Sequence, residues 1–250
     1  MKNTATALAG LVAGAILASA VHAAEITVLS GGAIEPGLHA AAAAFEKQTK
    51  HTVKITFNTT PQSVKRISGG ETFDVVILPP SALKQLAGAG KVEEGGVSVG
   101  RVGLGVLVRT NAPVPDISST DAIKRTVLEA ESMTFNRAST GIYFENLLKK
   151  MGVWEQVEPK TTRYPDGASV MEHIIKGKGR EVGFAAITEI LLYKDKGVRF
   201  VGPLPAEIQN YTTYVAAPMT GGANAALARE FAKFLGGPVG KPLFVAAGIE

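Results

Sequence analysis

Small polar residues and glycines gather at four points where a strand pattern gives way to a helix pattern. The four junctions are Ser30-Gly31-Gly32-Ala33, Asn58-Thr59-Thr60-Pro61, Ser139-Thr140-Gly141 and Asp166-Gly167-Ala168-Ser169. The first turn of a helix leaves backbone N–H groups free at the positive end of the helix dipole, so each junction can bind an anion. Hydroxyls add hydrogen bonds, and glycine lets a ligand approach the backbone. The pattern predicts an anion site, although such residues also cap helices for structural reasons alone.

Alternating strand and helix patterns would bring these junctions together. Apolar, β-rich runs predict strands at residues 26–29, 53–57, 74–78, 101–109, 132–136, 181–187, 197–201 and 211–217. Helical spacing of apolar residues predicts helices at 34–48, from 61 onward, and at 119–129, 140–151, 168–176, 223–235 and 239–247. We expect Thr60 to cap the second helix, with Pro61 in its first turn. This alternation indicates an α/β fold with mainly parallel sheets flanked by helices, in which ligands bind beyond the carboxyl ends of the strands.

The loop after residue 109, which contains Pro113 and Pro115, separates two α/β blocks. The order and length of the elements suggest that the chain returns to the first block near residue 210. We therefore predict a hinged pair of lobes. The predicted division is a signal peptide at 1–23, lobe I at 24–109 and 210–250, and lobe II at 110–209.

The first 23 residues have the features of a secretory signal peptide. Lys2 is followed by an apolar run from Ala5 to Ala20 and by small residues in Val21-His22-Ala23. The run is shorter than the roughly 20 residues that a membrane span needs. We expect cleavage near Ala23 or Ala24 and a soluble protein in the periplasm. Because the sequence has no cysteine, this protein must fold without disulfides.

Composition and motifs argue against several other classes of protein. The net charge is only +4 and Lys and Arg form no long cluster, so we expect no nucleic-acid partner. The sequence has no G-x-S-x-G, H-E-x-x-H or P-loop motif. His39, His51 and His173 lack the spacing of metal ligands. We predict a protein without catalytic residues, metal or cofactor, although an acid and a base far apart in sequence could still meet in space.

Several of these stretches match one family. They are residues 30–33, 57–60, 73–77, Thr140-Gly141-Ile142-Tyr143, and the Leu-Leu-Lys-Lys-Met-Gly-Val-Trp run at 147–154. Through them the chain resembles the periplasmic molybdate-binding proteins of ABC importers, part of the type II solute-binding superfamily, over essentially its whole mature length. The resemblance implies a monomeric two-lobed protein of type II fold. Its partners would be a small anion and an ABC permease at the inner membrane.

The resemblance also implies which residues touch the ligand. In that family two serines of the first lobe, backbone N–H groups at two loops of the second lobe, and a tyrosine hydroxyl hold the oxyanion. The serines fall on Ala33 and near Thr60, the backbone donors on Thr140 and Gly167, and the tyrosine near Ala186. With their neighbours, the predicted ligand-binding residues are Gly32, Ala33, Thr59, Thr60, Arg137, Ser139, Thr140, Gly167 and Ala186.

Two departures from the family pattern, at Ala33 and Ala186, leave the identity of the ligand undecided. Ala33 and Ala186 carry no hydroxyl, and each unmet hydrogen bond of a buried oxyanion costs about 1–3 kcal/mol. Arg137 and Arg163 precede two of the junctions, and either could offer a bidentate fork to a carboxylate. Molybdate or tungstate is the ligand that the resemblance implies, and an organic carboxylate is the alternative. A secreted enzyme on the same scaffold is the more distant alternative.

Overall fold

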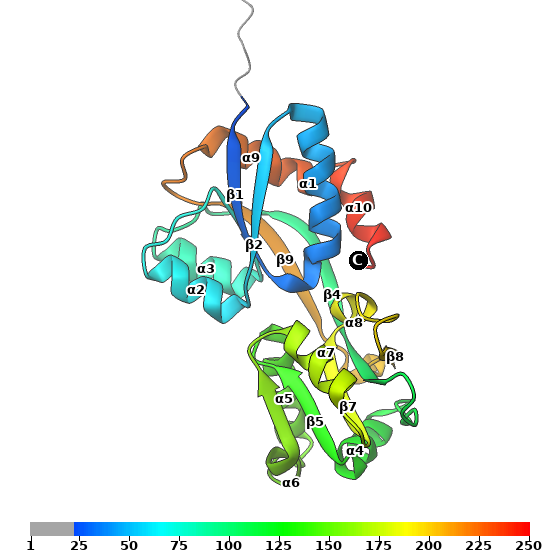
Figure 1. The fold of residues 1–250 in the computed structure, drawn as a ribbon. Helices are drawn as coiled ribbons and strands as arrows, with labels where there is room; N and C mark the ends of the chain where they lie inside the picture. The colour runs from blue at the N-terminus through cyan, green and yellow to red at the C-terminus, as the bar shows by residue number, and fades with distance from the viewer. Residues whose placement is uncertain (1–22) are drawn as a thin grey trace, which may run out of the picture.

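The structure is a computed structural model that describes residues 23–250 (Figure 1). The strands are β1 (Glu25–Ser30), β2 (Thr52–Phe57), β3 (Val75–Leu78), β4 (Val97–Arg109), β5 (Ser132–Asn136), β6 (Thr161–Tyr164), β7 (Glu181–Ala186), β8 (Val198–Pro203) and β9 (Tyr211–Pro218). The α-helices are α1 (Glu35–Thr49), α2 (Thr60–Ser68), α3 (Pro80–Gly88), α4 (Thr120–Glu129), α5 (Ser139–Lys150), α6 (Trp154–Val157), α7 (Gly167–Lys176), α8 (Ile187–Leu191), α9 (Ala225–Leu235) and α10 (Gly240–Ala246). Short 3-10 helices are η1 (Gly32–Ile34), η2 (Glu158–Lys160) and η3 (Ala206–Ile208).

The strands of the described chain form one continuous sheet in the order β2-β1-β3-β9-β4-β7-β5-β6, with β8 paired to β4. At one end β1 lies parallel between β2 and β3, and at the other β5 lies parallel between β6 and β7. Figure 1 shows these two ends as two lobes, one above the other. The first lobe contains β1–β3, β9, α1–α3, α9 and α10, and the second contains β5–β8 and α4–α8.

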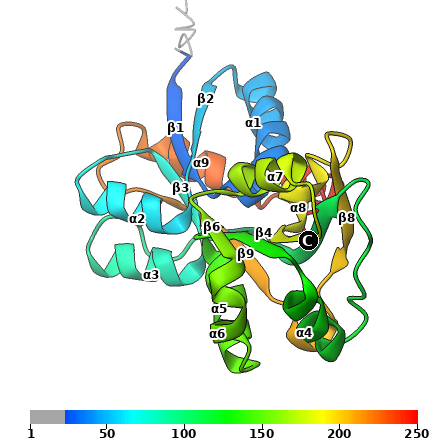
Figure 2. The same cartoon turned by 60° about the horizontal axis from the view of Figure 1, so that its bottom comes forward.

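Strand β4 runs through both lobes. From Val97 to Gly103 it pairs antiparallel with β9, and from Leu104 to Arg109 it pairs with β7 and β8. Figure 2 shows β4 and β9 passing through the middle of the molecule. Because no break in the sheet separates the lobes, the lobe boundaries predicted at 109/110 and 209/210 stay a prediction.

Each lobe buries apolar side chains on both faces of its part of the sheet. In the first lobe one core lies beneath α1, α9 and α10, where Phe45 and Phe231 pack edge to face with ring centroids 5.0 Å apart. A smaller core lies beneath α2 and α3. In the second lobe Phe144 packs against Phe135 and stacks on Phe184 beneath α5, and another core lies beneath α7 and α8. Helices on both faces therefore hold the carboxyl ends of the strands in fixed positions.

The predicted strands and helices form, with shifts of a few residues at their ends, and three α-helices, one strand and the short 3-10 helices were not predicted. Pro79-Pro80 was expected to close a strand, but Pro80 begins α3, because proline is tolerated where a helix has no internal N–H bond to make. The strand expected at 181–187 ends at Ala186, where the chain turns into α8. The short elements β6 and α6 carry too few residues for a periodic pattern.

The predicted leader lies outside the described residues except for Ala23. Within residues 23–250, no helix has both the length and the apolar character that crossing a membrane would require.

Candidate functional site

A cleft between the two lobes is lined by all four predicted junctions. Its volume is about 260 Å³, slightly below the roughly 300–1,000 Å³ that is common for small-molecule pockets, so its size favours a small solute. Seven of the predicted residues line it: Gly32, Ala33, Thr59, Thr60, Ser139, Thr140 and Gly167. The structure therefore brings together residues from both lobes, and their contact with a ligand stays a prediction.

Two of the predicted residues do not line the cleft. Ala186, the last residue of β7, is 1% exposed and packs in the core of the first lobe. Arg137 is exposed, and its backbone N–H bonds to the carbonyl of Tyr164. Arg163, the other arginine considered for a carboxylate, forms an ion pair with Glu145 and donates to the Asn136 carbonyl. Neither arginine is among the cleft-lining residues.

On the first lobe, the start of α2 differs from the sequence expectation by one residue. Thr59, not Thr60, is the N-cap, and Gln62 completes a capping box by accepting the Thr59 N–H at 2.9 Å. Pro61 is the second residue of α2. A backbone N–H at that position has no acceptor within the helix, so proline costs no hydrogen bond there. Capping is assigned to Thr59, so the hydroxyl of Thr60 is left to bond with the Ser139 hydroxyl, and both residues line the cleft.

On the second lobe, Asn136 fixes the start of α5. This side chain is 2% exposed, and its Oδ1 accepts hydrogen bonds from the Ala138 N–H, the Thr140 hydroxyl and the Gly141 N–H at 3.1–3.3 Å. Gly141 packs so closely that a Cβ there would lie 1.8 Å from the Asn136 carbonyl oxygen. Because β5 and α5 meet without space for a methyl group, the first-turn N–H groups of α5 are held rigidly at the cleft.

Asp166 caps α7, the other helix that begins at the second-lobe wall. Its carboxylate accepts the Ser169 N–H at 2.8 Å, as the junction pattern suggested. Gly167, the first residue of α7, follows Asp166 in the sequence and lines the cleft.

Two side-chain hydrogen bonds cross from one lobe to the other. The Ser139 hydroxyl donates to the Thr60 hydroxyl at 3.2 Å, at the starts of α5 and α2. The Thr188 hydroxyl, on α8, donates to the carbonyl of Ala33. Because Thr60 accepts from Ser139, its own hydroxyl hydrogen remains to donate to a ligand. The cleft is therefore in a closed form, with donors from both lobes on its walls.

Glu189, on α8, is a cleft residue that the sequence did not indicate. Its carboxylate lies between the lobes: a Cβ at Gly167 would be 2.4 Å from Oε2, and a Cβ at Gly32 would be 3.4 Å from Oε1. Oε2 is buried and has no hydrogen-bond partner in the described chain. Burial, followed by the nearby charges of Asp166 and Glu35, raises the pKa of this carboxyl to about 7. The only signal in the sequence was one acidic residue in the apolar run after β7.

Tyr214, on β9, is a second cleft residue that the sequence did not indicate. The sequence placed the tyrosine of the resemblance on Ala186, but Tyr214 lines the cleft from the first lobe. Its ring packs against the backbone of Gly31, where a Cβ would come within 2.6 Å of Cε1. Burial and the neighbouring Glu189 raise the pKa of its hydroxyl well above the ordinary value, so this group stays a neutral donor.

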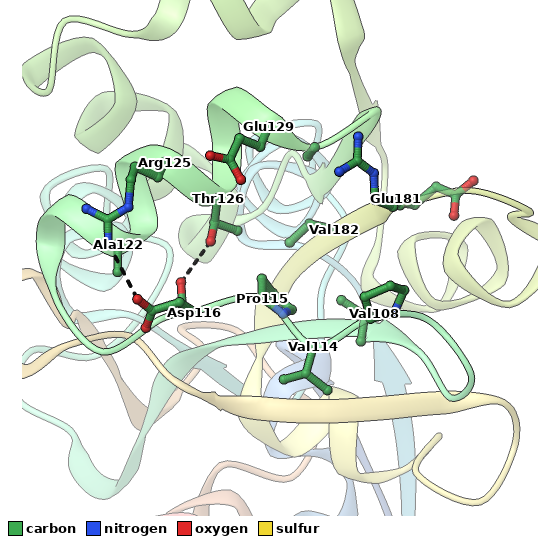
Figure 3. Close-up of a pocket in the computed structure, with 13 residues that line it drawn as sticks. Val108, Val114, Pro115, Asp116, Ala122, Arg125, Thr126, Glu129, Glu181 and Val182 are labelled. Atoms are coloured by element: carbon green, nitrogen blue, oxygen red, sulfur yellow. Dashed lines mark hydrogen bonds and ion pairs between the residues drawn. The ribbon is translucent and has the colours of Figure 1, made fainter.

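A second cavity, of about 210 Å³, lies within the second lobe (Figure 3). Its lining is partly apolar and partly charged, and four of the five charged residues bind local partners. Arg125 pairs with Asp116, and Glu181 accepts the backbone N–H groups of Lys178 and Gly179. Within residues 23–250, no unpartnered buried carboxylate and no pair of helix starts line this cavity, so the inter-lobe cleft is the better candidate site.

Comparison with known proteins gives one family match over nearly the whole chain. A protein-family model described as "Bacterial extracellular solute-binding protein" matches residues 26–250. An aconitate isomerase of a Pseudomonas species is 29% identical over 232 residues, which cover 90% of this chain and 87% of that protein.

Solved structures show the same fold at low sequence identity. The periplasmic molybdate-binding protein of Azotobacter vinelandii has a TM-score of 0.75 at 19% identity, over 90% of this chain and 98% of that chain. The sulfate-binding protein of Mycobacterium tuberculosis has a TM-score of 0.73 at 18% identity, over 90% of this chain and 86% of that chain. The predicted α/β fold of type II periplasmic binding proteins is thereby confirmed.

Proposed function

Because the chain belongs to the bacterial extracellular solute-binding protein family, we propose that its cleft captures a small organic carboxylate between the two lobes. The donor set of the cleft carries this proposal. Helix starts at α2, α5 and α7 offer N–H groups, and Thr60, Ser139 and Tyr214 offer hydroxyls. These groups suit the oxygens of carboxylates without requiring an arginine.

The same walls suit an inorganic oxyanion less well. Ala33 presents a methyl group where the resemblance to molybdate-binding proteins places a serine, so one donor to a tetrahedral oxyanion is lost. An organic acid instead has a carbon skeleton that can lie against the methyl group of Ala33.

The family supports a role in transport. We propose that the protein works in the periplasm as a monomer and that the closed form delivers its solute to an ABC permease at the inner membrane. Closure by contacts made to both lobes at once is the usual way in which two-lobed binding proteins respond to ligand. The hydrogen bond from Ser139 to Thr60 supports such closure here.

A second candidate function is isomerisation of the captured acid. The relative named aconitate isomerase shares 29% identity across 90% of this chain, and a type II scaffold can thus host an enzyme that acts on a carboxylate. An unpartnered carboxyl in the cleft wall supports the same candidate, since isomerases move protons with such groups. The prediction from sequence that the chain is not an enzyme is left untested.

A thermal-shift panel tests the ligand class. The probes are molybdate, tungstate, sulfate, citrate, cis-aconitate, trans-aconitate, trans-glutaconate and glutarate. A ligand at about 100 times its Kd adds about 2.7 kcal/mol, which shifts the Tm by roughly 5–10 °C for a chain of this size. We expect such a shift with at least one carboxylate and none with molybdate or tungstate. A shift with molybdate alone would contradict the proposal, and interconversion of the two aconitates without an ATPase would support the second candidate.

Thr60→Val tests the placement of the ligand. The substitution keeps the shape of the side chain but removes the hydroxyl of a residue that lines the cleft, and a hydrogen bond to a charged group contributes about 1.5–3 kcal/mol. We expect the Kd of the best carboxylate, measured by calorimetry, to rise about 10- to 100-fold. Thr120→Val is the matched control, because this hydroxyl bonds to Glu207 away from the cleft. Equal affinities in the two variants would place the ligand elsewhere.

A further inference from the structure

The carboxylate of Glu189 is buried between the lobes, and only part of its hydrogen-bonding capacity is met within the described chain. Its Oε2 is buried without a hydrogen-bond partner, whereas buried polar atoms in proteins are nearly always bonded. A carboxylate retained for stability would be expected to have a cation or N–H donors around that atom. Oε2 of Glu189 is therefore available to interact with a group of the bound ligand.

The side chains that face Glu189 come from three elements and supply no positive charge, while the backbone of Ala186 supplies one hydrogen bond that favours the charged form. Asp166, the cap of α7, and Glu35, in the first turn of α1, are both acids, and Tyr214 on β9 is a neutral hydroxyl. Burial and these two acids disfavour the charged form of Glu189. A pKa of about 7 leaves the carboxyl able to accept a proton and to give it back near neutral pH, which is the condition for efficient general acid–base catalysis.

Other residues of the cleft wall can stabilise negative charge on a bound acid. The first turns of α2 and α5, with the hydroxyls of Thr60 and Ser139, aim hydrogen-bond donors into the same cleft. When a C–H bond next to a carboxylate loses its proton, the electron pair moves onto the carboxylate oxygens. Donors held in fixed positions at those oxygens lower the barrier to that step. Asn136 and the tight contact at Gly141 keep the start of α5 fixed.

Building on the proposed carboxylate ligand, we propose that Glu189 is a catalytic base that takes a proton from the carbon next to a carboxylate of the bound acid. The C–H bond breaks, an O–H bond forms on Glu189, and the electron pair is held as an enolate whose oxygens bind at the helix starts. Return of the proton to the same carbon restores the acid. If a double bond lies next to that carbon, return to its far end moves the double bond instead. No oxidant, reductant or second substrate takes part.

Hydrogen exchange from D2O tests this step directly. The full chain without its leader is incubated with each of the three unsaturated acids of the panel, and loss of each C–H signal is followed by proton NMR. We expect exchange of the protons between a double bond and a carboxylate in at least one acid, at a rate that rises with pH and levels off above about pH 7. Glutarate, whose C–H groups lack an adjacent double bond, should exchange far more slowly.

Variants separate a catalytic role from a structural one. Glu189→Gln should keep the thermal shift of the carboxylate but slow the exchange by about 10²–10⁴-fold, the usual contribution of a general base. Glu189→Asp keeps a carboxylate and should restore part of the rate with the same form of pH dependence. Glu172→Gln makes the same change on the exposed side of α7, where Glu172 pairs with Lys176, and should leave the rate unaltered.

The outcomes distinguish the two proposals. A carboxylate that shifts the Tm of the wild type without any exchange would overturn the role of Glu189 and leave the binding function intact. Exchange that persists in Glu189→Gln would likewise overturn it. Absence of any thermal shift with the carboxylates would overturn the binding function itself.

Discussion

Replacement of Glu189 by glutamine raises the free energy of unfolding by about 2–3 kcal/mol at pH 8 and leaves it almost unchanged at pH 4. The pKa of this carboxyl is about 7 in the folded protein and about 4.5 once it is unfolded. Below pH 4.5 the Glu189 carboxyl is protonated in both the folded and the unfolded state, so it does not lower the free energy of unfolding. Between pH 4.5 and 7 the unfolded state loses the proton while the folded state keeps it, so stability falls as the pH rises. Above pH 7 the full cost, about 3 kcal/mol, is present in the wild type and absent in the neutral variant.

Urea denaturation of both proteins at pH 4, 6 and 8 measures this difference. The stability gap between variant and wild type should widen steadily across that range. Glu172→Gln, which changes an exposed and paired acid, should give a gap that hardly varies with pH. A gap of the same size at pH 4 and pH 8 would mean that glutamine acts by packing and that Glu189 is ionised in the ordinary range.

Replacement of Gly141 by alanine destabilises the protein by about 2–4 kcal/mol and removes the ligand-induced thermal shift. A Cβ at this position would lie 1.8 Å from the carbonyl oxygen of Asn136 and 2.7 Å from its carbon, and backbone cannot yield as a flexible side chain does. The start of α5 must move away from β5. The bonds from Asn136 to the first turn then break, and the donors of Ser139 and Thr140 leave their positions.

Gly88→Ala is the matched control for this substitution. Gly88 is the last residue of α3, and a Cβ there would meet nothing within 4 Å. Because alanine favours the helical state over glycine, this variant should be neutral or more stable by up to about 1 kcal/mol. Thermal melts with and without the best carboxylate compare the two. If Gly141→Ala kept the thermal shift of the wild type, the start of α5 would not be part of the binding site.

The position of the cleft could be predicted from the sequence because it depends on a rule of topology. The parallel strands β1 and β2 place the residues that follow them at one edge of the first lobe's part of the sheet, and β5 and β6 do the same in the second lobe. The two sets of strands run in opposite directions through the shared sheet, so these two edges face each other across the cleft. Small polar residues and glycines at those positions are visible in the sequence without any structure. The sequence did not show whether Thr59 or Thr60 caps α2. Either hydroxyl can cap a helix, and only the path of the backbone decides between them.

Two polar side chains of the cleft, those of Glu189 and Tyr214, could not be predicted in the same way. Glu189 lies in a helix of five residues, too short to show a periodic pattern, and its neighbours suggested that the strand would continue. Tyr214 belongs to a strand that was expected, but which of its faces meets the cleft depends on how β9 pairs with β3 and β4. Ala186 was placed in the site by the resemblance, and it lies in the core because the chain turns immediately after it.

The shared strand β4 limits how this molecule can be divided. A fragment that keeps the whole first lobe also carries Leu104–Arg109, whose backbone groups would have lost their partners in β7 and β8. Such a bare strand edge is a template for pairing with other chains. Cutting before Leu104 removes the exposed edge but separates the lobes inside a continuous sheet. A chimera of two related proteins is therefore best made by transferring the residues that line the cleft while the whole sheet of one protein is kept.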